Sequence, residues 1–186
     1  MKKKIGDNGF TCPMPMVLIG AEVDGKNNFM PAAWVSRVNF KPPLIAVALG
    51  PHHSNKGIEA NREFSVNIPG VDMLKAVDYC GLVSGKTTDK SALFKAFAGE
   101  LGHAPMIEEC PLTIECRLKQ SVDLGYDILY IADIVGVYCD EKHMTGGAPD
   151  PEKIKPFTLT MPDNNYWAMG EKIGKAWSDG KYFKSK

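Results

Sequence analysis

Three strand-like runs decide the fold of this chain: Asn28-Phe29-Met30-Pro31-Ala32-Ala33-Trp34-Val35-Ser36, Lys41-Pro42-Pro43-Leu44-Ile45-Ala46-Val47-Ala48-Leu49 and Glu63-Phe64-Ser65-Val66-Asn67-Ile68-Pro69. Each run is short and rich in residues that favour β-strands. They bracket a segment of small residues and hydroxyls, which would let a planar ligand lie against backbone amides.

The first strands are predicted to form a hairpin. We expect strands over Met16–Val23 and Phe29–Val35, joined by a loop of turn-forming residues over Asp24–Asn28. The third strand is expected to begin only at Leu44, because Pro42-Pro43 has no N–H group for a sheet. Six consecutive apolar residues from Leu44 predict burial on both faces, as in a closed or covered sheet.

Short helices are expected to interrupt the strands. Ser54 is predicted to be the N-cap of a helix over 55–60, and a strand over 63–68 should follow. Helical spacing also predicts a helix over 72–79, and Asp89 is a candidate cap for another one reaching Phe97. The local order is therefore strand, helix, strand, helix.

The second half of the chain predicts another hairpin. Apolar residues alternate over 112–118, and an apolar run over 128–138 follows a turn near 123–127. Residues 145–151 are expected to be a loop, and 164–186 show no clear period. With no repeat and no domain boundary, residues 1–186 are predicted to be one mainly β domain with short helices, a β-barrel rather than βαβ units.

Composition narrows the function classes. The 186 residues carry 22 Lys+Arg and 22 Asp+Glu, so the formal net charge is zero and the chain lacks the basic surface of a nucleic-acid binder. Its five cysteines include no C-x-x-C pair, which argues against a disulfide framework or a zinc site and favours a reducing cytoplasm. No export signal or membrane-spanning apolar segment is predicted.

The segment Gly81-Leu82-Val83-Ser84-Gly85-Lys86-Thr87 resembles the end of a P-loop. A true P-loop needs glycine where Cys80 stands, and it needs a preceding strand where this sequence predicts a helix. Two interpretations stay open. The segment is either an ordinary solvated turn, or a turn whose hydroxyls and single cation serve a phosphate or a polar ring edge.

Other candidate chemistries are weaker. His52-His53 invites a metal hypothesis, but no acidic or cysteine partner lies at a recognised spacing, and loop residues beside a ligand fit better. The chain has no G-x-S-x-G nucleophile elbow. Cys80 is either a catalytic thiol or a buried small residue. His103 and His143 are expected at the surface.

Trp34 has two interpretations. Between Ala33 and Val35 it suits core packing. Alternatively, small Ala32 and Ala33 would let a flat ring approach the backbone, with the Ser36 hydroxyl nearby. A flavin requires such a site, because the protein holds the ring and hydrogen-bonds its edge while the cofactor supplies the electron chemistry.

These residues resemble the flavoredoxin branch of the flavin reductase-like family. The resemblance runs in order along nearly the whole chain, through Asn28 to Ser36, Pro42-Pro43-Leu44, His53-Ser54, Ile58, Phe64 to Pro69, Cys80-Gly81-x-x-Ser84-Gly85-Lys86-x-x-Asp89-Lys90 and Tyr166-Trp167-x-x-Gly170-Glu171-x-Ile173-Gly174. It implies a split β-barrel that binds FMN non-covalently, as a homodimer with the cofactor near the subunit interface.

The resemblance also implies the cofactor-binding residues. Those flanking the flavin ring would be Asn28, Met30, Pro31, Ala32, Ala33, Trp34, Val35 and Ser36. The ribityl chain or phosphate would lie near Ser36, Ser54 and Asn55, and the cradle would be completed by Ser84, Gly85 and Lys86. His53 is also among the implied cofactor-binding residues. No residue is predicted to be catalytic, since the chemistry belongs to the flavin, and no metal is expected.

The sequence departs from the family pattern in three places. Where relatives often carry an Asp-His pair, this chain has Tyr126-Asp127-Ile128, so a role tied to that histidine has no residue here. A usual Gly-Glu pair is replaced by Ala132-Asp133. Lys86 stands where arginine is common, which keeps the charge but loses bidentate geometry.

The leading hypothesis is an FMN-dependent oxidoreductase that takes electrons from NAD(P)H and passes them to flavin, iron or a protein acceptor. The alternative is a flavoredoxin-like electron-transfer module without efficient NAD(P)H oxidation. A split-barrel oxidase of pyridoxamine phosphate fits the segment Cys80–Lys90 less well.

Overall fold

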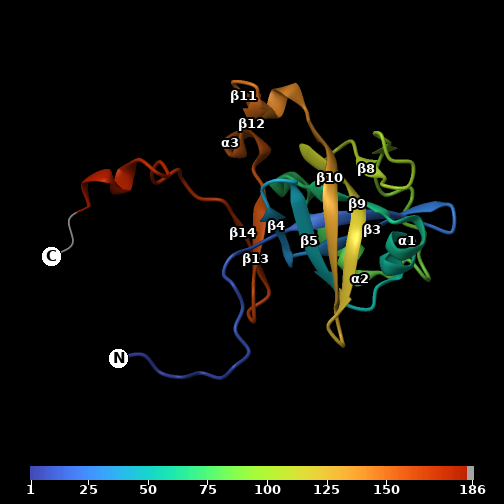
Figure 1. The fold of residues 1–186 in the computed structure, drawn as a ribbon, viewed down its shortest axis with the longest axis horizontal. Coiled ribbons are helices and arrows are strands. Elements are labelled where there is room, and N and C mark those ends of the chain that lie inside the picture. The colour runs from blue at the N-terminus through green and yellow to red at the C-terminus, as the bar shows by residue number, and fades with distance from the viewer. Residues whose placement is uncertain (184–186) are drawn as a thin grey trace.

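A seven-stranded antiparallel sheet is the centre of the computed structural model, which describes residues 1–183 (Figure 1). Its strand order is β3-β2-β6-β9-β10-β5-β4. The strands are β2 (Val17–Val23), β3 (Lys26–Ala32), β4 (Val35–Asn39), β5 (Leu44–Leu49), β6 (Glu63–Ile68), β9 (Leu112–Asp123) and β10 (Ile128–Cys139).

A two-residue link closes this sheet. The edge strands β3 and β4 are consecutive in the chain and only Ala33 and Trp34 separate them, so Ala32 and Val35 lie within about 11 Å of each other. The Trp34 carbonyl also accepts a hydrogen bond from the Ala48 N–H on β5, at 3.0 Å. The sheet therefore curls until its two edges nearly meet, which is the split barrel that was predicted.

The link also corrects the predicted second strand. Phe29–Val35 was expected to be one strand, but the chain turns a corner at Ala33-Trp34 to reach the other edge of the sheet. The loop predicted over Asp24–Asn28 is likewise too long. Asp24 (φ 51°) and Gly25 (φ 77°) alone make the turn, in the left-handed conformation that two-residue hairpins require.

The inside of the barrel is apolar, and the third strand was predicted correctly. β5 begins at Leu44, and its residues are buried or half-buried along its whole length. Together with β2, β6, β9 and β10 it surrounds a core that includes Val47, Phe64 and Tyr130, each at most 1% exposed. Burial of large side chains at this density is the main source of stability for such a sheet.

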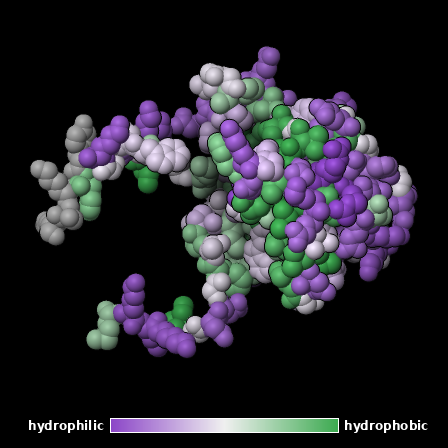
Figure 2. Space-filling model, in the orientation of Figure 1, coloured by the Kyte–Doolittle hydropathy of each residue, from purple (hydrophilic) through white to green (hydrophobic). Residues whose placement is uncertain are grey.

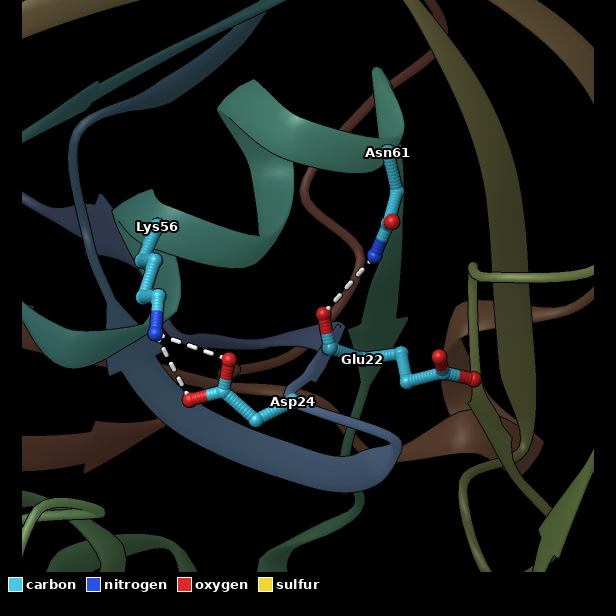
Figure 3. Close-up of polar contacts among 4 residues, drawn as sticks. All are labelled: Glu22, Asp24, Lys56 and Asn61. Carbon is cyan, nitrogen blue, oxygen red and sulfur yellow. Dashed lines mark hydrogen bonds and ion pairs between the residues drawn. The ribbon is translucent and has the colours of Figure 1, made fainter.

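Helix α1 (His53–Asn61) packs against the β2–β3 hairpin. Lys56 Nζ lies 2.7 Å from Asp24 Oδ2, and Asn61 Nδ2 donates to the Glu22 carbonyl at 2.9 Å (Figure 3). These contacts fix both ends of the helix relative to the hairpin. The direction of its N-terminus is thereby fixed as well.

The predicted Ser54 cap is wrong. His52 occupies the N-cap position, and its side chain makes no capping hydrogen bond. Ser54 lies inside the first turn, fully buried, and its Oγ accepts a hydrogen bond from Asn28 Nδ2 at 2.7 Å. The serine side chain therefore joins the helix to β3 instead of capping the helix.

The predicted helix over 72–79 is confirmed, as η1 (Val71–Met73) followed by α2 (Leu74–Leu82). The helix predicted from Asp89 to Phe97 is wrong. The chain there forms turns and then β7 (Ala96–Phe97), which pairs with β8 (Met106–Ile107). Asp89 accepts a hydrogen bond from the Ser91 N–H at 2.9 Å, so it stabilises a turn, and Phe94 is buried against Phe29.

The late hairpin is confirmed and is longer than predicted, because β9 and β10 each have 12 residues. The remaining elements are small and lie after it in the chain, apart from β1. They are β1 (Met14–Pro15), η2 (Glu141–His143), β11 (Met144–Thr145), β12 (Ala148–Pro149), α3 (Pro151–Ile154), β13 (Phe157–Thr160), β14 (Asn165–Ala168) and η3 (Asp179–Tyr182).

The C-terminal region contains structure that the sequence pattern did not reveal. β14 pairs with β13, which also pairs with β1. Beyond β14 the chain leaves the body, and both ends extend on the same side in Figure 1. Ile173 and Trp177 in this segment are almost completely exposed.

The surface combines charged and apolar areas (Figure 2). Hydrophobic residues are visible on the face that carries β5 and β10, and the exposed ones nearby include Val38, Phe40 and Val137. All five cysteines are unpaired thiols. Among residues 1–183, no helix has the length and apolar character needed to cross a membrane.

Candidate functional site

Three adjoining hollows lie where the β3–β4 link, the start of α1 and the loop after α2 come together. The middle one has a volume of about 270 Å³. It shares Met30, Pro31, Pro51 and His52 with an apolar hollow of about 330 Å³. On its other side it shares Asn28, His53, Gly85, Lys86 and Lys90 with a polar hollow of about 450 Å³.

The polar end is built around Asn28 and Gly85. Asn28 is buried and donates to Ser54 Oγ at 2.7 Å. Gly85 approaches so closely that a Cβ atom there would overlap Asn28 Oδ1 and lie 2.8 Å from His53 Cδ2. Only glycine fits this position, so the loop backbone lies directly against β3 and α1.

Two sources of positive potential face this end. The first N–H groups of α1 have no partner within the helix, and the helix dipole places partial positive charge there. Lys86 is exposed at the rim, and no ion-pair partner for it is found within residues 1–183. This combination suits an anion such as a phosphate.

The turn that carries Lys86 is not a P-loop, as predicted. It follows α2 rather than a strand. Two of its N–H groups are hydrogen-bonded to Ser84: the Thr87 N–H donates to the Ser84 carbonyl at 3.0 Å, and the Lys86 N–H donates to Ser84 Oγ at 3.2 Å. A compact turn with one free cation results.

Lys90 is a residue of this site that the sequence did not reveal. Lys90 lines the middle hollow and the polar hollow, although it is only 4% exposed. Its Nζ donates to the Phe29 carbonyl at 3.1 Å and to the Cys80 carbonyl at 2.7 Å. Burial lowers the pKa of Lys90. An ammonium group has three donors, so one remains for a ligand.

The apolar end surrounds Trp34. Met30, Ala32 and Ala33 form one wall, Ala48 and Leu49 contribute from β5, and Tyr126 and Met161 complete the rim. Trp34 is 45% exposed, so it is not a core residue, and the interpretation as simple core packing is not supported. A flat apolar ring would find large hydrophobic surfaces here.

His52 lies where the two ends meet. Its N–H donates to the Gly50 carbonyl at 2.8 Å, and its carbonyl accepts from the Asn55 N–H at 3.3 Å. Partial burial and the Lys90 charge lower the pKa of His52, and Asp127 opposes this shift. His52 was predicted only as a loop residue beside a ligand, and Asp127 was not a predicted site residue; the two become neighbours only through the fold.

Three predicted site residues line none of these hollows. Val35 packs against the barrel core. Ser36 is exposed on β4, and its Oγ donates to the Arg37 carbonyl at 3.2 Å. Asn55 is 8% exposed, and its Nδ2 donates to the Gly50 carbonyl at 2.9 Å. Asn55 Oδ1 has no hydrogen-bond partner, alone among the buried side-chain polar atoms of residues 1–183.

The other eleven predicted site residues do line the hollows: Asn28, Met30, Pro31, Ala32, Ala33, Trp34, His53, Ser54, Ser84, Gly85 and Lys86. The structure also bears on two other candidates. Burial raises the pKa of the Cys80 thiol, which is unfavourable for a nucleophile. No cluster of His, Cys, Asp and Glu side chains within residues 1–183 could hold a metal ion.

Comparison with known proteins decides the family. The flavin reductase-like domain family matches residues 10–156. The chain belongs to the flavin reductase-like family. Within this family it is similar to the flavoredoxin from Methanosarcina acetivorans, at 46% identity over 97% of this chain and 98% of that one, with a TM-score of 0.95.

A second flavoredoxin and a more distant protein share the fold. The flavoredoxin of Desulfovibrio vulgaris (Miyazaki F) is 32% identical, with a TM-score of 0.90 over 97% of this chain and 100% of that one. A protein from Thermus thermophilus that is named FMN-binding has a TM-score of 0.77 at 23% identity, over 94% of this chain and 98% of that one, which shows a common fold. The flavoredoxin resemblance of the sequence is thus confirmed.

Proposed function

We propose that this flavin reductase-like protein binds FMN non-covalently and transfers electrons through it. The FMN phosphate lies at the polar end, beside Lys86, Lys90 and the N-terminus of α1. The ring lies in the apolar hollow beside Trp34, and the ribityl chain passes through the middle hollow that connects them. The charged end of FMN thus lies against a cationic surface and its ring against an apolar one.

The observation that carries this proposal is the continuity of the three hollows from a cationic end to an apolar end. At the cationic end, Gly85 brings the loop backbone so close to Asn28 that a β-carbon would overlap it. At the apolar end, small Ala32 and Ala33 leave the backbone open to a flat ring. An anion joined to a planar apolar group is the ligand that this arrangement fits.

Bound FMN supplies the electron chemistry, because a flavin can accept a hydride or exchange single electrons. The protein's own residues have three tasks. Lys86, Lys90 and the α1 N–H groups hold the phosphate, and Trp34 and Met30 restrict the position of the ring. The fixed positive charge of Lys86 and Lys90 offsets the negative charge of the phosphate.

NAD(P)H is the electron donor of the leading proposal, and a flavin, an iron compound or a redox protein is the acceptor. A flavoredoxin-like module that exchanges electrons with proteins is the second candidate, which the 46% identity to a flavoredoxin favours. Anaerobic stopped-flow mixing of the FMN-loaded protein with NADH and with NADPH separates the two. Rapid bleaching of the flavin absorption excludes the passive module.

We also propose a homodimer in which a second copy covers the β4–β5 face. Val38 and Phe40 are exposed there, and Ser36 lies on the same strand without lining a hollow of its own chain. A second copy on this face would bring Ser36 toward an interface. Light scattering after size exclusion tests this: the wild type should have twice the mass of one chain, and Val38→Asp should reduce it.

The direct test of FMN binding is the absorption spectrum of the purified protein, followed by titration of the cofactor-free protein with FMN. We expect flavin absorption that survives gel filtration and quenching of the added FMN fluorescence. A colourless protein that neither quenches nor shifts added FMN would contradict the proposed function.

A further inference from the structure

We propose that His52 takes up a proton when the bound flavin is reduced, so that this protein consumes two protons for every two electrons. The inference rests on the proposed FMN site and concerns residues that the family resemblance did not assign. Its basis is a cluster of three side chains that meet around Gly50, at the boundary between the apolar and the middle hollow.

Gly50 gives the geometry of the cluster. A Cβ atom placed on Gly50 would lie 3.4 Å from Asp127 Oδ1, 3.4 Å from Tyr126 Cε1 and 3.7 Å from His52 Nε2. Because both atoms are measured from the same point, Asp127 Oδ1 and His52 Nε2 are separated by no more than the sum of these distances, about 7 Å. At such a separation a carboxylate favours the charged form of an imidazole.

The backbone of His52 is held in place beside the hollow proposed for the ring. Its backbone is held on both sides, by the bond to the Gly50 carbonyl and by the bond from Asn55. Its side chain lines both the hollow proposed for the ring and the hollow proposed for the ribityl chain. Charge on the ring must therefore act on this imidazole at short range.

Among the ionisable groups around His52, the imidazole of His52 itself is the best placed to take up a proton when the ring gains negative charge. Lys86 and Lys90 face it from the loop after α2 as ammonium groups, which donate hydrogen bonds and have no site for a further proton. Burial raises the pKa of the Cys80 thiol, which therefore keeps its proton, and Tyr126 and Asp127 face His52 from the rim of the apolar hollow. His53 is the next residue and lines the middle and polar hollows, but unlike His52 it does not line the apolar hollow proposed for the ring.

The direction of the change follows from charge. In the oxidised protein, partial burial and Lys90 lower the pKa of His52, so the imidazole is neutral near neutral pH. Transfer of a hydride brings two electrons and one proton, and it leaves one negative charge on the ring. That charge adds to the effect of Asp127 and raises the pKa of His52. One proton from solvent then converts His52 to imidazolium, and the charge of the site is unchanged overall.

Two measurements test this inference. The first is an NMR titration of the labelled imidazoles in the cofactor-free, FMN-oxidised and FMN-reduced protein, with the His52 signal assigned by its loss in His52→Gln. We expect its titration to move to higher pH on reduction. The second is the midpoint potential of the FMN against pH, where each proton taken up with two electrons contributes about 30 mV per pH unit.

The wild type should show about 60 mV per pH unit over the range in which His52 titrates, and His52→Gln should show about 30. His103→Gln is the matched control, because His103 is an exposed histidine that pairs with Glu22 away from the site, and it should retain the wild-type slope. In Asp127→Asn the steep range should move to lower pH.

Two results would overturn the inference alone, with FMN binding intact. One is a His52 titration that does not move on reduction. The other is a slope near 60 mV per pH unit in His52→Gln, which would assign the second proton to the flavin itself. A failure of FMN to bind at all would be visible in the absorption spectrum and would overturn the proposed function as well.

Discussion

Two buried charged side chains, Glu115 and Lys90, behave very differently in this fold. Glu115 lies on β9 and is completely buried. Its carboxylate accepts hydrogen bonds from the Glu100 N–H at 3.2 Å, from the Leu101 N–H at 3.0 Å and from the Tyr138 hydroxyl. All of its partners are protein groups, so this charge stabilises the loop that packs on the barrel.

Lys90 is nearly as buried but is not saturated. Its Nζ donates to two carbonyls, Phe29 and Cys80, and the residue lines the two polar hollows. A saturated buried charge has a structural role, whereas an unsaturated one at a cavity has capacity left for a ligand. Glu115 is therefore expected to contribute mainly to stability and Lys90 mainly to ligand binding, and substitutions should distinguish the two roles.

The largest expected effect is on stability at Glu115. Glu115→Ala removes the acceptor for two backbone N–H groups and one hydroxyl, and it should lower the free energy of unfolding by about 3 to 5 kcal/mol, since each buried donor left without a partner costs about 1 to 3 kcal/mol. Chemical denaturation of the cofactor-free protein measures this. If Glu115→Ala unfolds at the wild-type midpoint, the structural role of this carboxylate is wrong.

Lys90→Met should show the reverse pattern. The methionine fills the buried volume, so the loss of stability should be smaller than for Glu115→Ala. FMN affinity should fall by at least tenfold, because a charged hydrogen bond is worth about 1.5 to 3 kcal/mol. Unchanged FMN affinity in a folded Lys90→Met protein would remove Lys90 from the site.

Gly85→Ala tests the close approach at the polar end. The added Cβ would overlap Asn28 Oδ1, so the loop must move away; overpacking of this kind lowers stability by about 1 to 3 kcal/mol, and the displaced loop should also weaken FMN binding. Gly102→Ala is the control, because a Cβ there meets nothing within 4 Å. Equal FMN affinities in the two variants would contradict the proposed cradle.

Lys86→Ala and Ser54→Ala should each weaken FMN binding, by roughly 1 to 3 kcal/mol where the lost hydrogen bond is charge-assisted. Lys75→Ala removes an exposed lysine of α2 that lines none of the three hollows, so it controls for net charge. Fluorescence titration with FMN measures all three. Lys86→Ala and Ser54→Ala titrating like Lys75→Ala would count against the phosphate position.

Trp34→Ala should have a smaller effect on stability than Glu115→Ala. A side chain that is 45% exposed contributes less than a core aromatic, whose loss costs about 3 to 5 kcal/mol. We therefore expect a folded variant in which the flavin ring is more accessible to a soluble quencher. Failure of Trp34→Ala to fold would instead indicate that Trp34 is a core residue.

The β-sheet was largely predictable because its strands carry local signals. The six apolar residues from Leu44 and the pair of prolines before them located β5, and the alternation in β9 was visible as well. The failures have one physical cause. The helix from Asp89, the cap at Ser54 and the core-packing interpretation of Trp34 were inferred from neighbours in sequence, but the positions of these residues depend on contacts between elements.

The site was predictable only in part for the same reason. The resemblance supplied eleven residues that line the hollows, including Gly85, whose role depends on its distance from Asn28. Lys90, His52 and Asp127 come from three different elements, and no spacing in the chain relates them. Ser36 and Val35, predicted near the flavin, line no hollow of a single chain and become relevant only if a second copy approaches.

The most direct test of the account compares FMN with riboflavin, which has the same ring and ribityl chain but no phosphate. Calorimetric titration of the cofactor-free protein should give tight FMN binding and riboflavin binding at least tenfold weaker, a difference of about 1.4 kcal/mol or more. Lys90→Met should reduce that difference. Equal affinities for the two flavins, or no binding of either, would contradict a site built from a cationic end and an apolar end.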